Sequence, residues 1–148
     1  MKTKCNRIIH FFMFTFLCCY ANAETDLAVE STASIMQIMV ARIVPASDTL
    51  WGVDDPTSDE DWKTLEDAAN AMLDSGAAIK LGGTGPRDKQ WVSQRDWKML
   101  AEKMIAAAGQ ALQAIRNKNL DALFDAGDAL YQPCEECHGI FNPAVIDQ

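Results

Sequence analysis

Two cysteines and a histidine lie close together near the C-terminus of this 148-residue chain, in the run Cys134-Glu135-Glu136-Cys137-His138. Thiols three residues apart on a helix can each form a thioether with one haem vinyl group, and this spacing followed by histidine is the attachment signature of c-type haem. His138 follows Cys134 at i+4 and so lies on the same helical face, where its imidazole can reach the iron as proximal ligand. The motif predicts one covalently attached haem c.

Three other chemistries fit these residues less well. A disulfide between Cys134 and Cys137 would close a very small loop, and the stabilisation from a disulfide grows with loop length. A redox-active dithiol normally belongs to a strand-helix unit of thioredoxin type, and this chain shows no strand pattern. Structural zinc takes four protein ligands, whereas two Cys and one His supply three.

The first 23 residues differ in composition from the rest of the chain. Lys2, Lys4 and Arg7 precede a mostly apolar run over residues 8–20, which is followed by the small-x-small triplet Ala21-Asn22-Ala23. The apolar run is shorter than the roughly 20 residues that a spanning helix needs. Residues 1–23 are therefore predicted to be a secretory signal peptide cleaved after Ala23, with the bacterial periplasm as destination and no membrane anchor afterwards.

Cleavage changes the charge and the inventory of reactive side chains. Of 13 Lys and Arg, three precede the cleavage site, while all 21 Asp and Glu follow it, so the charge of residues 24–148 is 10 minus 21, or -11. The only Cys and His that remain are those of the haem motif. A strongly acidic chain is not expected to bind nucleic acid, because that affinity rests on Lys and Arg neutralising phosphates. Its charge suggests a basic protein partner or none.

The hydrophobic pattern along residues 24–148 has a helical period throughout. Four helices are predicted: the first over residues 26–44, the second from a Thr57 or Ser58 cap to residue 81, the third over residues 93–117 from Ser93 and Asp96, and the fourth from Asn119 into the cysteine pair. Pro45 is expected to end or kink the first helix, with a short segment beyond it. Residues 84–91 are expected to form a loop. One all-α domain, a four-helix bundle over residues 24–148 with haem attached near its C-terminus, is the simplest arrangement.

A helical bundle with Cys134, Cys137 and His138 near its C-terminus resembles the class II cytochromes c, the cytochrome c′/c556 group. The resemblance covers most of residues 26–143. It implies that His138 is the proximal ligand, that the first helix covers the distal face of the haem, and that two copies can pair as a homodimer through their first two helices. It also implies that the protein is not an enzyme.

Two functions remain open within this resemblance. Six-coordinate members place a Met from the first helix on the iron and carry electrons, whereas five-coordinate cytochromes c′ leave the iron open to nitric oxide or carbon monoxide. Residues 139–143 lack the basic residue that cytochromes c′ usually carry near the proximal histidine, and Pro133 directly precedes the first cysteine. Electron transfer is therefore the favoured expectation. A third reading, outside this resemblance, is a haem-free exported helical module whose Cys pair is incidental.

The sixth ligand, if present, must come from upstream of the motif, since no Met follows it. Met36 and Met39 both lie on the predicted first helix. Met39 is favoured because it continues the face of Ile35 and Ile43 at i+4 spacing. The remaining methionines of the three later helices are expected to pack in the core, as methionine often does: Met72, Met99 and Met104.

Overall fold

A computed structural model describes residues 32–145, and these residues form an all-helical bundle without strands. The signal peptide predicted over residues 1–23 and the start of the first predicted helix lie outside the described residues. The helical elements are, in order, α1 (Ile35–Ile38), the π-helical segment η1 (Met39–Ile43), α2 (Val44–Trp51), α3 (Asp59–Leu81), α4 (Asp88–Val92), α5 (Arg95–Arg116), α6 (Leu120–Phe141) and the 3-10 turn η2 (Pro143–Val145). The prediction of an all-α chain is confirmed for these residues.

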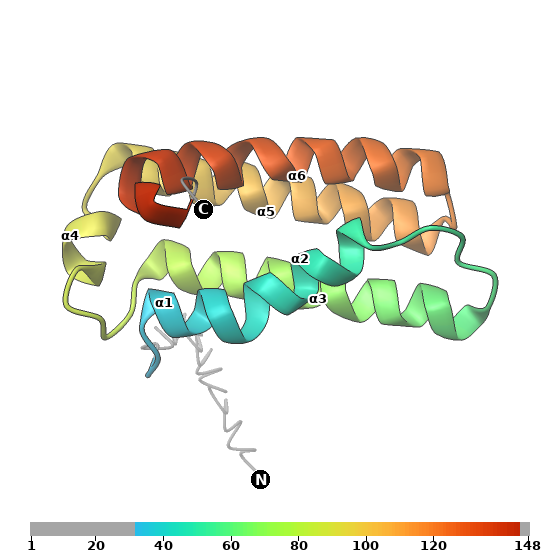
Figure 1. Cartoon of the computed structure of the whole chain (residues 1–148), viewed down its shortest axis with the longest axis horizontal. Coiled ribbons are helices and arrows are strands. Elements are labelled where there is room, and N and C mark those ends of the chain that lie inside the picture. The colour runs from blue at the N-terminus through green and yellow to red at the C-terminus, as the bar shows by residue number, and fades with distance from the viewer. Residues whose placement is uncertain (1–31, 146–148) are drawn as a thin grey trace, which may run out of the picture.

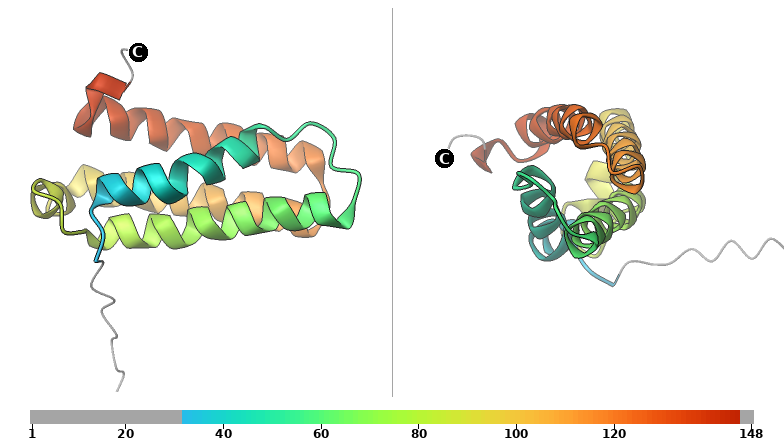
Figure 2. Two further views of the ribbon diagram at one scale, coloured as in Figure 1. Left: turned by 60° about the horizontal axis from the view of Figure 1, so that its bottom comes forward. Right: turned by 90° about the vertical axis from the view of Figure 1, so that its right-hand side faces the viewer.

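The long helices lie side by side, and α4 crosses one end of the molecule (Figure 1). Helix α3 packs against α5 and α5 against α6, while α2 packs mainly against α3 and touches α6 less extensively. Seen from the end, the helices surround a common centre (Figure 2, right).

The first helical stretch runs unbroken from α1 through η1 into α2, because a wide turn accommodates Pro45. A proline in regular α-helix clashes with the carbonyl four residues earlier and donates no hydrogen bond. Here the amide of Val44 donates to the carbonyl of Met39, five residues back, in the π-helical pattern. The prediction that the helix ends or kinks at Pro45 is thus replaced by a local π segment, with α2 as the short segment expected beyond it.

The start of this stretch lies later than predicted. The described residues before Ile35 are not helical. Ser34 is the N-cap: its hydroxyl accepts from the amide of Gln37, and the Gln37 side chain accepts from the amide of Ser34. This reciprocal capping box satisfies two helix-terminal donors and fixes the start of the helix. The prediction that residues 32–34 belong to the first helix is therefore wrong.

Helices α3 and α6 begin where their caps predict. Ser58 accepts from the amide of Asp61, whose carboxylate accepts in return from Ser58, and Asn119 Oδ1 accepts from the amide of Ala122 at 3.1 Å. Helix α3 ends at Gly82, whose φ of 115° is readily adopted only by glycine.

Two expectations around the third helix are wrong. The loop expected over residues 84–91 contains most of α4, and Ser93 ends α4 rather than starting α5, since its hydroxyl donates to the carbonyl of Gln90. Helix α5 begins after Gln94, which makes no side-chain cap.

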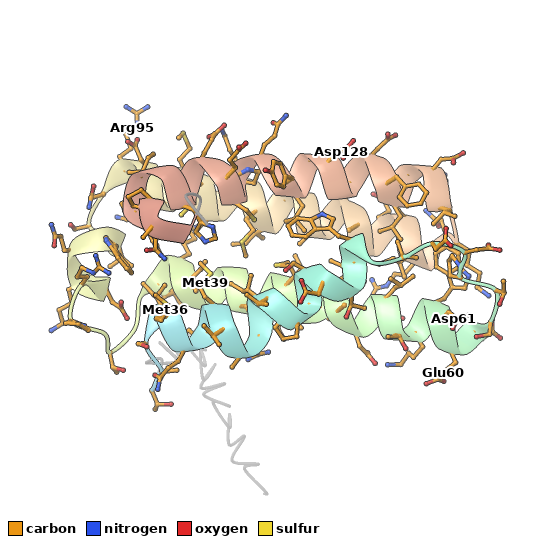
Figure 3. All side chains as sticks on the ribbon, in the orientation of Figure 1. Met36, Met39, Glu60, Asp61, Arg95 and Asp128 are labelled. Atoms are coloured by element: carbon orange, nitrogen blue, oxygen red, sulfur yellow. The ribbon has the colours of Figure 1, made fainter. Side chains whose placement is uncertain are left out.

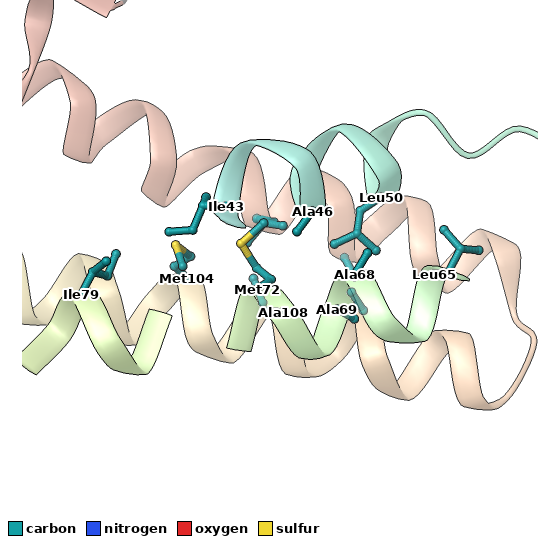
Figure 4. Packing of buried hydrophobic residues seen from close by; sticks show 14 of the residues in the cluster. Ile43, Ala46, Leu50, Leu65, Ala68, Ala69, Met72, Ile79, Met104 and Ala108 are labelled. Atoms are coloured by element: carbon teal, nitrogen blue, oxygen red, sulfur yellow. The ribbon is translucent and has the colours of Figure 1, made fainter. Parts of the chain in front are cut away.

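The core lies between the first helical stretch, α3, α5 and α6, and mixes branched residues with alanines that let the helices approach closely (Figure 4). Met72, Ala69 and Ala108 are fully buried in it. Ion pairs between helices, such as Lys80 with Glu102 at 2.7 Å, lie on the surface and contribute little to stability. Burial of apolar side chains therefore stabilises the bundle.

Candidate functional site

The haem-motif residues lie in the last turns of α6, on one face of the helix. Cys134, Cys137 and His138 stand at i, i+3 and i+4, and all three side chains are half-buried. The helix continues through Pro133, which is itself buried directly before the first cysteine. Helical geometry thus presents both thiols and the imidazole to the same space, as the sequence predicts.

Opposite α6, the wall of this space comes from the first helical stretch. Met39, the first residue of η1, and Ile43, its last, line a hollow together with Cys134, Cys137 and His138. The hollow holds about 410 Å³ of space, its open side included, and its remaining lining is apolar: Ile79, Trp97, Leu100, Ala101, Met104 and Pro133. Methionine and histidine side chains far apart in the sequence therefore border one apolar space.

The methionines separate clearly by position. Met39 is half-buried and lines the hollow, whereas Met36, one turn earlier, is 46% exposed and does not. Figure 3 shows both on the first helical stretch. Met72 is buried in the core as predicted, and Met104 is buried and also borders the hollow. The prediction that Met99 packs in the core is wrong, because its side chain is 39% exposed on the outer face of α5.

The electrostatics of the site are those of neutral groups. Burial raises the pKa of Cys134 to about 11 and, together with the neighbouring Cys134, that of Cys137 to about 11. Burial lowers the pKa of His138. Both thiols are consequently protonated at neutral pH and the imidazole is uncharged. Reactive cysteines have lowered pKa values, so this pair does not match a redox-active dithiol.

Trp97 lines the hollow, and two other aromatic rings pack against it. Its ring stacks on Trp91 with centroids 5.5 Å apart and meets the edge of Phe141 at 5.1 Å. Its indole N–H donates to the carbonyl of Ile79 at 2.9 Å. Phe141 lies three residues after His138, so the same cluster also fixes the end of α6. The sequence places Trp97 on an apolar stripe but gives no sign of this stacking.

Asp88 was not predicted to have any role near the site. Asp88 is 3% exposed, and its Oδ2 accepts from the amides of Ile35 at 2.9 Å and Gly85 at 2.8 Å. The one available signal is its position after a Gly-Thr-Gly-Pro-Arg run, since Asp in such turns often accepts hydrogen bonds from nearby backbone amides.

The residues at the hollow suit a covalently attached haem better than a bare metal ion. No group of three or more His, Cys, Asp or Glu converges on a point within residues 32–145. A haem iron takes its equatorial ligands from the macrocycle and needs only axial ligands from protein, which a neutral His and a Met can supply. Cys134 and Cys137 are both free thiols, and the apolar lining matches a large hydrophobic ring.

Comparisons with protein-family models, curated proteins and solved structures find no match for this chain. Within residues 32–145, none of the helices is long and apolar enough to span a membrane.

Proposed function

We propose that this protein is an exported monohaem cytochrome c of class II type, a four-helix bundle over residues 24–148 that carries electrons in the periplasm. Cys134 and Cys137 would hold the haem through thioethers, and His138 and Met39 would be the two protein ligands of its iron. The observation that carries the proposal is that Met39 borders the same apolar hollow as the complete attachment motif, although almost a hundred residues separate them.

The surroundings of the hollow support electron transfer rather than catalysis. When bound, the haem iron supplies a one-electron couple between its ferric and ferrous states. The neutral imidazole of His138 offers a lone pair to a metal, and a thioether opposite it raises the reduction potential. Ile43, Leu100 and Trp97 give the site an apolar lining. The residues that line the hollow besides the motif are apolar, which suits a buried electron-transfer group.

The expected redox partner is a basic protein. Helix α6, which carries the attachment motif, contains five acids and no Lys or Arg: Asp121, Asp125, Asp128, Glu135 and Glu136. Of these, Glu136 pairs with Lys103 at 3.2 Å. Attraction of a basic partner to this helix speeds association at low ionic strength and weakens as salt screens it.

The test is the optical spectrum of the full chain matured with a haem-attachment system, recorded in both oxidation states with and without carbon monoxide. Haem that stays with the protein on a denaturing gel establishes attachment, and Cys134→Ser with Cys137→Ser should abolish it. We expect a low-spin spectrum with a weak Met-to-iron charge-transfer band. Met39→Leu should remove this band, whereas the control Met36→Leu should keep it, because Met36 does not border the hollow.

A different result would select another function. A high-spin spectrum that changes readily with carbon monoxide in the unsubstituted protein would replace the Met39 ligand by an open distal site and the electron carrier by nitric oxide or carbon monoxide binding. Absence of covalent haem after maturation would refute both. Size-exclusion chromatography of the matured protein tests the homodimer that the family resemblance implies.

A further inference from the structure

A hydrogen bond to the buried carboxylate of Asp88 joins the start of the first helical stretch to α4 at the end of the bundle. The amide of Ile35 is the first donor of α1, and such donors have no partner within their own helix. Ile35 is 2% exposed, so water does not supply the missing acceptor. Asp88 supplies it: Oδ2 lies 2.9 Å from the amide of Ile35 and 2.8 Å from that of Gly85. A negative charge at a helix N-terminus also interacts favourably with the helix dipole.

The loop before α4 closes tightly around this contact. The amide of Thr84 donates to the carbonyl of Ala33 at 3.2 Å. A Cβ on Gly83 would lie 2.6 Å from both the Ala33 carbonyl oxygen and Asp88 Oδ2, and one on Gly85 would lie 2.6 Å from Asp88 Oδ1. Both glycines therefore permit an approach that a side chain would prevent.

One turn of helix connects Asp88 to Met39. The carbonyl of Ile35, whose amide is bound by Asp88, accepts the hydrogen bond donated by the amide of Met39. Met39 begins the π segment, where the regular i to i+4 ladder changes. The position of its backbone thus depends on the turn that Asp88 holds in place.

Through Trp91, α4 also contacts α5 and the end of α6, the helix that carries His138. Trp91 of α4 stacks on Trp97, and both rings meet Phe141 at the end of α6, with centroids 6.3 Å and 5.1 Å from that of Phe141. The guanidinium of Arg87 lies over the Trp91 ring, 4.8 Å from its centroid. A five-residue helix therefore touches the start of the Met39 helix through Asp88 and the end of the His138 helix through Trp91.

We infer that Asp88 is a positioning residue for the distal ligand: by holding the start of α1 against α4, it sets where Met39 stands relative to His138. This inference rests on the proposed function for the identity of the ligand. Asp88 does not line the hollow and touches neither axial side chain, so its effect on the site passes through the backbone of α1.

The experiment compares Asp88→Ala and Asp88→Asn with Ser58→Ala in the matured full chain. Ser58→Ala is the matched control, because it removes a helix cap of similar kind at the opposite end of the molecule, the end marked by Asp61 in Figure 3. For Asp88→Ala we expect loss of the Met-to-iron band in part of the population. Apparent binding of carbon monoxide to the ferrous protein should become at least about fivefold tighter. An unsatisfied buried amide shifts the equilibrium between the forms with and without Met39 on the iron by that factor or more. Asp88→Asn keeps one acceptor oxygen and should show a smaller change, which also covers the case in which the alanine variant fails to fold.

Amide hydrogen exchange supplies a readout that does not depend on iron. Exchange across residues 35–39 should accelerate in the Asp88 variants and stay unchanged in Ser58→Ala. Faster exchange without any change in the spectrum would overturn the role in ligand positioning, and unchanged exchange would overturn the attachment itself. Failure of the proposed function is recognised separately, by the unsubstituted protein lacking covalent haem or its Met-to-iron band.

Discussion

Replacement of Ser75 by alanine is expected to stabilise the protein, although most substitutions in a core destabilise. Ser75 lies in α3 and is fully buried, and its hydroxyl has no hydrogen-bond partner among the described residues. Its neighbours one turn away on the same helix, Met72 and Ile79, are buried and apolar. A buried hydroxyl without a partner costs about 1–3 kcal/mol, and alanine is favoured over serine inside a helix by up to about 0.5 kcal/mol.

The cavity left by one oxygen atom offsets part of this gain, so the expected increase in unfolding free energy for Ser75→Ala is about 1–2 kcal/mol. For a domain of this size that corresponds to an increase in Tm of about 4–8 °C. Ser47→Ala is the matched control. Ser47 is also buried and helical, but its hydroxyl donates to the carbonyl of Val44 at 2.8 Å. Loss of this satisfied bond, partly offset by helix propensity, should leave stability unchanged or lower it by up to about 1 kcal/mol.

The assay is urea unfolding of both variants and the parent protein, followed by circular dichroism at a helical wavelength. Equal slopes against denaturant would show that each substitution changes stability and not the extent of unfolding. The reasoning is refuted if Ser75→Ala is no more stable than the parent, or if the two serine variants shift in the same direction by the same amount. Either result would mean that the Ser75 hydroxyl finds a partner in solution.

Two further predictions concern the loop at Gly83 and the cap of α3. Gly83→Ala should lower the unfolding free energy by at least about 1 kcal/mol, as overpacking does, because its Cβ would lie 2.6 Å from the carbonyl oxygen of Ala33. Thermal melting measures this change. An unchanged Tm would contradict the close approach. Hydrogen bonds from Ser58 and Thr57 lower the pKa of Asp61 below its usual 3.8, so its carboxylate stabilises the fold above that pH and the contribution is lost as pH falls through the lowered value. Asp61→Asn should therefore unfold at lower urea concentration than the parent at pH 6, with the difference shrinking towards pH 3 and a constant difference arguing against the linkage.

Local signals in the sequence predict where α3 and α6 begin, because each N-cap residue forms its hydrogen bonds within the first turn of its own helix. Ser58 and Asp61 bond to each other within one turn, and Asn119 bonds to an amide three residues away. Such contacts depend on nearby residues alone. Gly82 likewise predicts the end of α3 from local sequence, since a positive φ at that position favours glycine.

The errors arise where distant residues decide the structure. Helix α4 has only five residues, too few for a hydrophobic period, and is stabilised by Trp91 on Trp97 and by Asp88 on Ile35. The last of these contacts spans 53 residues. By sequence, Ser93 could cap the start of α5 or the end of α4. Its hydroxyl donates to the carbonyl of Gln90, so it caps the end of α4. No pattern within a short window contains this information.

The candidate site shows the same division between local and distant information. The i, i+3 and i+4 spacing of Cys134, Cys137 and His138 predicts their common face on any helix. The preference for Met39 over Met36 rests on the face that Ile35 and Ile43 share, and the structure places Met39 at the hollow. Its role as a ligand stays a prediction until the spectrum is measured.

The π segment shows why the regular helical period used to choose between Met36 and Met39 describes this stretch incompletely. In the structure the buried positions Ile38 and Ile43 are five residues apart, one more than an α-helical face allows. The extra residue is absorbed between Met39 and Val44, where the hydrogen bond reaches back five residues. Pro45 is the sequence feature that accounts for it, because proline has no N–H to donate and its ring would clash with the carbonyl four residues earlier in a regular turn. π-Helical turns occur frequently at functional sites, and here the turn begins at the residue proposed to bind iron. A proline shortly after a candidate ligand on a helix is therefore grounds to examine the turn between them before a face is assigned by period alone.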